Sequence, residues 1–227
     1  MRNNRIRLLV LMLFWGIVPS WAQNPVFDHP LSTQTLPDFD AVCAQLESRP
    51  YTTGVFEQTR TVKRQNRSLV SGGDFIAAAD MGLVWITKSP VPSITTLGRD
   101  YMIQSVPGGT ETRIDAKGSD IYINMADTIS SLFTGNAARL KSSFEIYYTK
   151  TQTANGKAWT IGLIPKETAF RNYAQRIVIE GFDGGQVSII QSIVIEEKNG
   201  DSLIYVFSRQ TFPEALEDNE KKYFSAR

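Results

Sequence analysis

The main pattern along the chain is a series of short segments in which hydrophobic and polar positions alternate. Trp159, Ile161 and Leu163 fall on one face of such a segment, and the residues between them fall on the other. A period of two is typical of a β-strand that buries one of its faces. The same alternation runs through residues 203–207 and through residues 83–86.

Turn-forming residues separate these segments at short intervals, and they predict an antiparallel meander. Gly, Asn and Asp recur between the apolar runs, as in 107–110 and 198–201, where turns need positive φ angles. We count roughly ten strands, all in meander order and without helical crossovers, so we expect antiparallel pairing. The strand through Phe56, Gln58 and Arg60 is polar on both faces in places. This favours one curved sheet with a partly solvated face over a two-sheet sandwich.

Two stretches depart from the strand pattern. Residues 37–47 place Phe39, Val42, Cys43 and Leu46 at helical spacing, which predicts an amphipathic helix that buries the single cysteine as a small hydrophobic residue. A reactive or intermolecular thiol is the alternative.

Residues 126–142 have helical or irregular character, with an interruption at Gly135 that fits either a mobile cover or an ordinary helix end. The tail after Phe212 is charged and is expected to be loosely held.

The N-terminus has the order of charged, apolar and small residues that is typical of a secretory signal peptide. Arginines precede an apolar run at 8–18, and Ser20 and Ala22 occupy the −3 and −1 positions of a cleavage site after Ala22. The apolar run is shorter than the roughly 20 residues that span a bilayer. We therefore expect residues 1–22 to be removed and residues 23–227 to form a single exported domain.

The charge balance excludes some classes of partner. Removing the three arginines of the signal peptide leaves 21 basic residues against 23 acidic ones. A near-neutral chain without a basic run argues against binding to nucleic acid and against an electrostatic membrane patch.

Residues that could perform catalysis or hold a metal are sparse. His29 is the only histidine and precedes the first helix, away from any serine or cysteine elbow. One histidine and one cysteine cannot form a zinc site of the usual composition, and the carboxylates stand singly at turns. We therefore expect no catalytic residues, no metal, no cofactor and no enzyme activity; an exported hydrolase that uses His29 or a carboxylate is the rival hypothesis.

The order of these elements resembles the LolA family, the periplasmic carriers of outer-membrane lipoproteins. The resemblance runs from about residue 38 to 207 and is carried by short motifs in a fixed order. They are the Phe56-x-Gln58 strand, Gly73-x-Phe75, the Trp85-x4-Pro90 spacing and the strand from Trp159 to Pro165-Lys166.

Membership would imply a mainly β protein with helices. Its fold would be an incomplete, strongly curved antiparallel β-barrel whose helices cover a cavity for acyl chains. The residues expected to line that cavity are Phe56, Phe75, Leu83, Trp85, Ile129, Leu132 and Phe133.

The resemblance also implies a role and a location. The chain would be a monomeric periplasmic carrier that shields the acyl chains of lipoproteins or another lipid during transfer towards the outer membrane. Its partners would be an inner-membrane transporter and an outer-membrane acceptor. Carriers of this architecture also handle glycolipids, and others monitor envelope stress, so a regulatory or scaffolding module that binds a protein partner is the alternative. Many members carry an Arg-Pro pair that ties the helices to the sheet, whereas residues 78–80 here read Ala-Ala-Asp.

Overall fold

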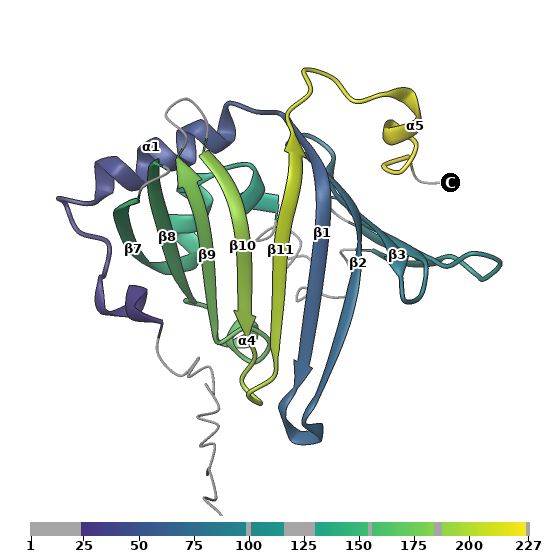
Figure 1. The fold of residues 1–227 in the computed structure, drawn as a ribbon, viewed down its shortest axis with the longest axis horizontal. Helices are drawn as coiled ribbons and strands as arrows, with labels where there is room; N and C mark the ends of the chain where they lie inside the picture. The colour runs from purple at the N-terminus through teal and green to yellow at the C-terminus, as the bar shows by residue number, and fades with distance from the viewer. Residues whose placement is uncertain (1–23, 99–100, 116–129, 154–155, 184–187, 226–227) are drawn as a thin grey trace, which may run out of the picture.

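The computed structural model describes residues 24–98, 101–115, 130–153, 156–183 and 188–225. Within these ranges eleven strands form one antiparallel sheet (Figure 1). The strands are β1 (Tyr51–Val62), β2 (Arg67–Ala78), β3 (Gly82–Ser89), β4 (Ser93–Leu97), β5 (Tyr101–Ser105), β6 (Thr112–Asp115), β7 (Phe144–Thr153), β8 (Gly156–Pro165), β9 (Arg176–Asp183), β10 (Ser188–Glu196) and β11 (Ser202–Thr211).

The strand order leaves the barrel open. It runs β6-β5-β4-β3-β2-β1-β11-β10-β9-β8-β7, so the first and last strands of the chain pair in the middle of the sheet. The strands β6 and β7, neighbours in the sequence, lie at opposite edges. The predicted fold, an incomplete and curved antiparallel barrel with helices, is therefore confirmed.

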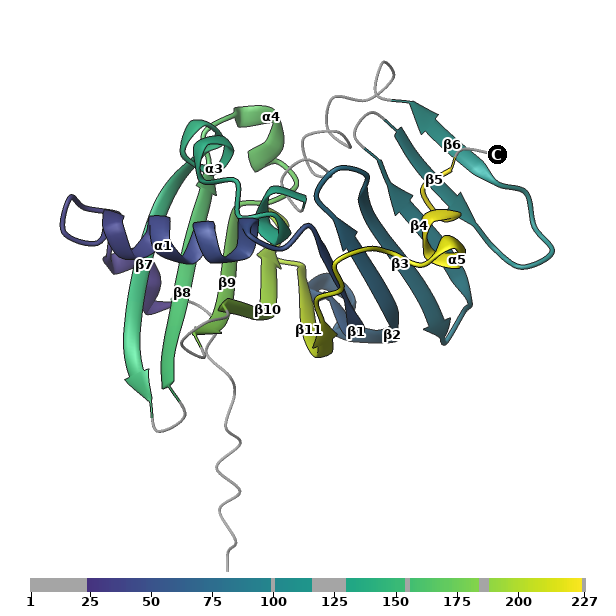
Figure 2. The same cartoon turned by 90° about the horizontal axis from the view of Figure 1, so that it is seen from above.

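The helices are short and lie outside the sheet. They are η1 (Pro25–Asp28), α1 (Leu36–Glu47), η2 (Lys63–Gln65), α3 (Ala137–Ser143), α4 (Thr168–Arg171) and α5 (Asp218–Lys221). Helix α1 buries the four residues whose spacing predicts it, including Cys43, and lies across the ends of β7 to β10 (Figure 2). The predicted interruption at Gly135 separates a helical turn at 130–133 from α3.

Strand alternation divides the buried residues between the two faces of the sheet. The concave face carries the largest core cluster, to which α1, the turn 130–133 and α3 contribute residues. The convex face carries two smaller clusters, one beneath η1 with Val26 and one beneath the C-terminal segment.

The C-terminal segment is packed on the sheet, which contradicts the expectation of a loose tail. Leu216 is 3% exposed and Phe224 is 8% exposed, and both contact the convex face of β2 and β3. The side-chain hydroxyls of Thr96 and Tyr101 donate hydrogen bonds of 2.9 and 2.7 Å to the backbone carbonyls of Tyr223 and Phe224. The segment is mostly charged, but its two buried apolar residues hold it on the sheet.

Two predictions concern residues whose structure is not described. The signal peptide at 1–22 lies outside the described residues, as do residues 126–129 at the start of the helical insert. Among the described residues, no helix combines the length and the apolar character needed to cross a lipid bilayer.

Candidate functional site

Six aromatic side chains meet on the concave face of the sheet. Ring centroids are 4.7 Å apart between Phe56 and Trp85 and 5.1 Å apart between Phe75 and Phe207. Aromatic pairs in such edge-to-face or tilted arrangements contribute about 0.5–1.5 kcal/mol each beyond the area that they bury. The group, here called the aromatic cluster, consists of Phe56, Phe75, Trp85, Phe133, Tyr205 and Phe207.

The register of the strands brings these residues together. Phe56 on β1 lies opposite Phe207 on β11, and Phe75 on β2 lies opposite Trp85 on β3. Because side chains alternate between the faces of a strand, all four point to the concave side.

Two glycines allow close packing in the strands that carry the aromatic cluster. A Cβ atom at Gly54 would lie 2.8 Å from Cε1 of Phe75, so only glycine accommodates that ring. Gly73 lies opposite Phe56, and a Cβ atom there would lie 1.9 Å from the carbonyl oxygen of Ile86. The missing side chain at Gly54 therefore leaves space for the Phe75 ring, and the missing side chain at Gly73 lets the backbones of β2 and β3 approach closely.

The helical turn 130–133 supplies the sixth member of the aromatic cluster. The ring of Phe133 lies 5.5 Å from that of Phe75 and 5.2 Å from that of Phe207, and the neighbouring Leu132 is 4% exposed. The hydrogen bonds of residues 130–134 to described residues stay within the helical segment. Apolar contacts alone therefore hold this turn against the described part of the sheet.

The helices beside the turn 130–133, α1 and α3, are attached more firmly. The turn and these two helices are here called the cover. Gly135 has a φ of +62°, and a Cβ atom there would lie 2.1 Å from the carbonyl oxygen of Cys43 on α1. The Lys141 ammonium on α3 lies 2.6 Å from the Asp40 carboxylate on α1, and the Ser188 hydroxyl on β10 donates to Gln45 of α1. The interruption at Gly135 is thus a close packing contact with α1.

The structure brings most of the predicted residues together. Ile129 lies outside the described residues. Six of the seven expected lining residues belong to one buried cluster on the concave face: Phe56, Phe75, Leu83, Trp85, Leu132 and Phe133. Their contact with a lipid stays a prediction.

Two members of the aromatic cluster, Tyr205 and Phe207, are absent from the predicted set. Tyr205 stacks on Trp85 with ring centroids 5.0 Å apart. Burial raises the pKa of Tyr205 to about 12, and the nearby Arg60 partly opposes that increase. The alternation of residues 203–207 places both on a buried face, but only the pairing of β1 with β11 shows that they join Trp85.

The rings at the centre of the aromatic cluster are shielded from solvent. Trp85 is 9% exposed, and Phe75 and Phe133 are 0% and 6% exposed. Among the predicted lining residues that the structure describes, Phe75 borders a pocket of about 360 Å³ beside the C-terminal segment. A ligand on the concave face would therefore have to displace part of the cover.

Polar chemistry is sparse in the described interior. No group of three or more His, Cys, Asp and Glu side chains in the described ranges is arranged to hold a metal ion. The backbone carbonyl of His29 accepts a hydrogen bond from the backbone N–H of Tyr148, so this loop extends the edge of β7. Burial, reinforced by the Asp40 carboxylate, raises the pKa of the Cys43 thiol to about 12, which keeps it protonated and unreactive.

Comparison with known proteins adds information about the fold. No family model matches the sequence, and no curated protein matches it either. A DUF1329 family protein from Desulfovibrio piger is similar in structure, with 12% identity and a TM-score of 0.50 over 89% of this chain and 98% of the other.

Two further solved structures are similar at lower TM-scores. One is a domain assigned to outer-membrane lipoprotein sorting from Vibrio parahaemolyticus, with 10% identity and a TM-score of 0.46 over 88% of this chain and 100% of the other. The other is a LolA superfamily protein from Nitrosomonas europaea, with 8% identity and a TM-score of 0.42 over 84% and 97%. Likenesses at such identities concern the fold alone.

Proposed function

We propose that this protein is a periplasmic carrier that shields acyl chains, of lipoproteins or of another lipid, on the concave face of its sheet during transfer towards the outer membrane. The observation that carries the proposal is the purely apolar contact between the helical turn 130–133 and the aromatic residues that the strands contribute to the cluster. Phe133 and Leu132 fill the concave face without a hydrogen bond to the described part of the sheet. An acyl chain could replace them there without breaking a hydrogen bond between this turn and the described part of the sheet.

The magnitudes favour such an exchange. Burial of a methylene contributes about 0.8 kcal/mol, so a sixteen-carbon chain offers on the order of 12 kcal/mol before costs. Re-exposing two side chains the size of Leu132 and Phe133 costs roughly 3–6 kcal/mol. Loss of translational and rotational freedom removes several kcal/mol more. The balance permits binding without a dedicated polar site, which agrees with the sparse polar chemistry of the described interior.

The location and the partners follow from the same proposal. The signal peptide expected at residues 1–22 would export the chain, and the LolA-like fold supports a place in the periplasm. An inner-membrane transporter would load the carrier, and an outer-membrane acceptor would unload it. An open concave face would expose more apolar surface than soluble monomers usually do, so the cover has to close between these two events.

Tryptophan fluorescence provides a direct test, because residues 23–227 contain only Trp85 and Trp159. Trp85 lies in the aromatic cluster, whereas Trp159 is 1% exposed on β8. A brominated fatty acid quenches tryptophan on contact, so it should quench Trp159→Phe, which retains Trp85, saturably and strongly. The matched variant Trp85→Phe, which retains Trp159, should be quenched much less.

Gentle purification and mass spectrometry of extracted lipid provide the second test. A carrier should retain acyl lipids in a defined ratio to protein. If neither tryptophan is quenched saturably and the preparation holds a stable protein partner but no lipid, the carrier proposal is wrong and the envelope regulatory module replaces it.

A further inference from the structure

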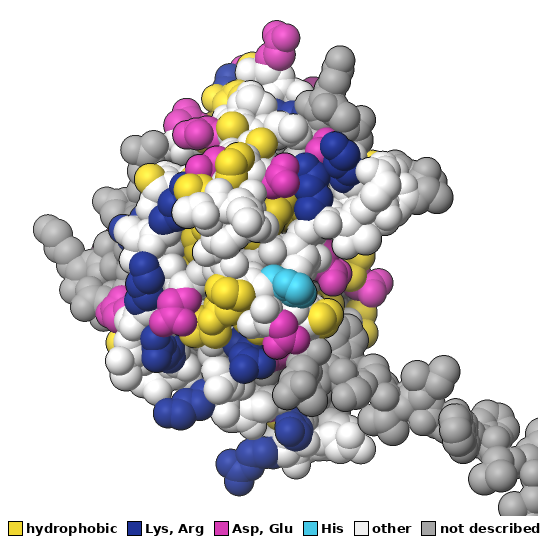
Figure 3. Space-filling model, turned by 90° about the vertical axis from the view of Figure 1, so that its left-hand side faces the viewer, with side chains coloured by type: hydrophobic (Ala, Val, Ile, Leu, Met, Phe, Trp, Pro, Cys, Tyr) yellow, Lys and Arg dark blue, Asp and Glu magenta, His cyan; other side chains and the backbone are white. Residues whose placement is uncertain are grey.

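A cluster of cations lies at the turn between β1 and β2. Lys63, Arg64 and Arg67, here called the basic tip, are all exposed, and no acidic residue occurs between residues 58 and 73. The turn is at the lower end of the molecule in Figure 1, and the space-filling view shows dark-blue side chains protruding at that end (Figure 3). The net charge of the whole chain is near zero, so it does not reveal this local excess of positive charge.

The charges of the basic tip are not neutralised by the described part of the protein. The described ion pairs use other cations, and the nearest of these is Arg60, whose guanidinium lies 3.2 Å from the Glu197 carboxylate. Another acidic group at this end, Asp201, is 6% exposed, and its carboxylate accepts hydrogen bonds from the Lys63 backbone N–H and the Asn199 side-chain amide. Three positive charges therefore face the solvent together.

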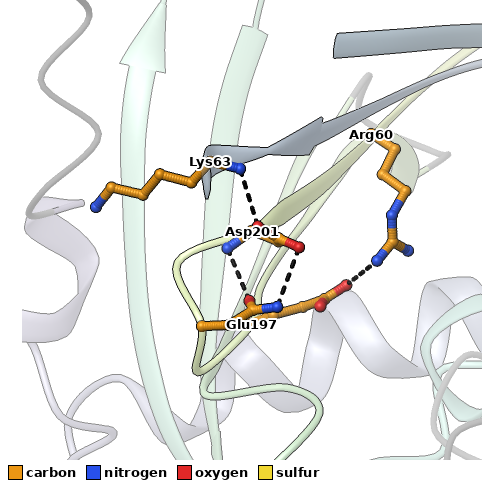
Figure 4. Close-up of polar contacts among 5 residues, drawn as sticks. Arg60, Lys63, Glu197 and Asp201 are labelled. Atoms are coloured by element: carbon orange, nitrogen blue, oxygen red, sulfur yellow. Dashed lines mark hydrogen bonds and ion pairs between the residues drawn. The ribbon is translucent and has the colours of Figure 1, made fainter. Parts of the chain in front are cut away.

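The neighbouring β10–β11 turn holds the basic tip in a defined position. The Asp201 carboxylate accepts a 2.9 Å hydrogen bond from the backbone N–H of Lys63 and a 3.0 Å bond from the Asn199 amide (Figure 4). The side chain of Lys63 points away from this network (Figure 4). Asn66 closes the turn with a left-handed φ of 47°. The backbone is thus fixed while the cationic side chains stay available.

Exposed aliphatic side chains adjoin the cations. Leu69 and Val70 are 64% and 53% exposed at the start of β2, and they lie on opposite faces of the strand. A rigid turn that combines cations with exposed aliphatic residues has the chemistry that binds a membrane surface, where cations meet anionic headgroups and apolar groups enter the acyl boundary.

We propose that the basic tip docks this protein on an anionic membrane surface, with Lys63, Arg64 and Arg67 at the phospholipid headgroups and Leu69 and Val70 at the edge of the acyl layer. This contact uses the outside of the hairpin and does not depend on acyl chains binding to the concave face. The proposal differs from the expectation, drawn from the near-neutral charge and the lack of a basic run, that the chain has no electrostatic membrane patch. Binding depends on charges within about a Debye length of the surface.

Vesicle sedimentation tests the proposal with residues 23–227, which contain every element of the described fold. The protein should sediment with vesicles that contain phosphatidylglycerol and remain in solution with vesicles of phosphatidylcholine alone. Each cation near an anionic surface contributes about fivefold in affinity, so Lys63→Gln/Arg64→Gln/Arg67→Gln should bind about a hundredfold more weakly. High salt should weaken the wild type and leave the variant almost unchanged.

A matched variant controls for total charge. Lys157→Gln/Lys221→Gln/Lys222→Gln removes three exposed cations from the opposite end of the molecule (Figure 1). It should retain anionic-vesicle binding within a few-fold of wild type. Equal losses in the two triple variants, or equal binding to the two kinds of vesicle, would overturn the proposal. Absence of vesicle binding by the wild type would also overturn it and would favour an acidic protein as the partner of the tip.

A fluorescent label locates the contact. Cys43 is buried and its thiol stays protonated, so Gln65→Cys introduces one reactive thiol at the exposed turn. A polarity-sensitive dye there should shift to shorter wavelength on anionic vesicles, and the shift should disappear in Leu69→Gln/Val70→Gln. A dye at Lys222→Cys should show no shift, whereas a shift there and none at residue 65 would place the contact elsewhere.

Discussion

Trp85 and Tyr205 stack with ring centroids 5.0 Å apart and planes 22° apart, although three strand steps separate β3 from β11. Neighbouring strands lie about 4.8 Å apart, so a flat sheet would separate these two backbones by roughly 14 Å. The contact therefore depends on the curvature of the sheet across β1 and β2, which brings side chains from its two halves together.

The stack predicts how Tyr205 titrates. In Trp85→Ala the phenol gains access to water, so its pKa should fall from about 12 towards its ordinary value of 10. Carbon-13 labelling of the tyrosine rings and NMR titration would resolve Tyr205 among the eight tyrosines. Trp159→Ala, which removes a buried indole from β8, should leave the Tyr205 pKa unchanged. An unchanged pKa in Trp85→Ala as well would show that other neighbours desolvate the phenol.

The apolar attachment of the turn 130–133 predicts an effect on ligand access. Phe133→Ala should lower the free energy of unfolding by about 3–5 kcal/mol, as truncation of a buried phenylalanine usually does. It should also accelerate hydrogen exchange at 130–134 and the association of an acyl probe, because the cover loses its main contact with the sheet.

Phe170→Ala is the matched control for the cover. Phe170 is 5% exposed on α4 and pairs with Phe144, outside the aromatic cluster. Its truncation should cost a similar free energy of unfolding and leave probe association unchanged. If both variants accelerate association equally, general destabilisation rather than the cover controls access.

The packing of Gly135 against α1 predicts a severe effect of a single methyl group. Gly135→Ala combines a left-handed φ with a Cβ atom 2.1 Å from the Cys43 carbonyl oxygen, so the free energy of unfolding should fall by more than about 3 kcal/mol. Gly108 has a similar φ of +71° and nothing within 4 Å of its Cβ position, so Gly108→Ala should cost only about 1–2 kcal/mol. Urea denaturation measures both, and equal losses would show that the contact with α1 relaxes.

The packed C-terminal segment predicts that its apolar residues contribute to stability. Leu216→Ala and Phe224→Ala should each cost about 2–5 kcal/mol in the free energy of unfolding, because each leaves a cavity against the convex face. Val91, which is 66% exposed, is a control whose change to alanine should stay within about 0.5 kcal/mol. If thermal or urea denaturation shows no loss of unfolding free energy for Leu216→Ala, the tail is loosely held after all.

The buried thiol predicts a loss of stability at alkaline pH. The pKa of Cys43 rises from 9.0 to about 12 on folding, so above pH 9 the unfolded chain releases a proton that the folded chain keeps. Stability should therefore fall as pH rises from about 9 to 12, by up to about 1.4 kcal/mol per pH unit for this group. Cys43→Ala should reduce that slope in denaturation curves, whereas an identical slope would assign the loss to other groups such as Tyr205.

Much of the fold follows from local patterns. The spacing of Phe39, Val42, Cys43 and Leu46 predicts α1, and alternation identifies the buried face of the strand through Trp159. Six of the proposed lining residues fall in one cluster because strand motifs and a helical motif both mark apolar positions. The prediction of a loosely held tail after residue 212 is wrong. Two apolar residues among many charges are enough to anchor a segment but too few to form a periodic pattern.

What the sequence by itself determined is the face on which each side chain lies, because the period of a strand or helix depends only on local backbone geometry. The tertiary structure decided which of those faces meet. The pairing of β1 with β11 brings Phe207 to Phe56, and curvature brings Trp85 to Tyr205. It also placed the β1–β2 turn, whose cations are already neighbours in the sequence, at one exposed end of the molecule (Figure 1).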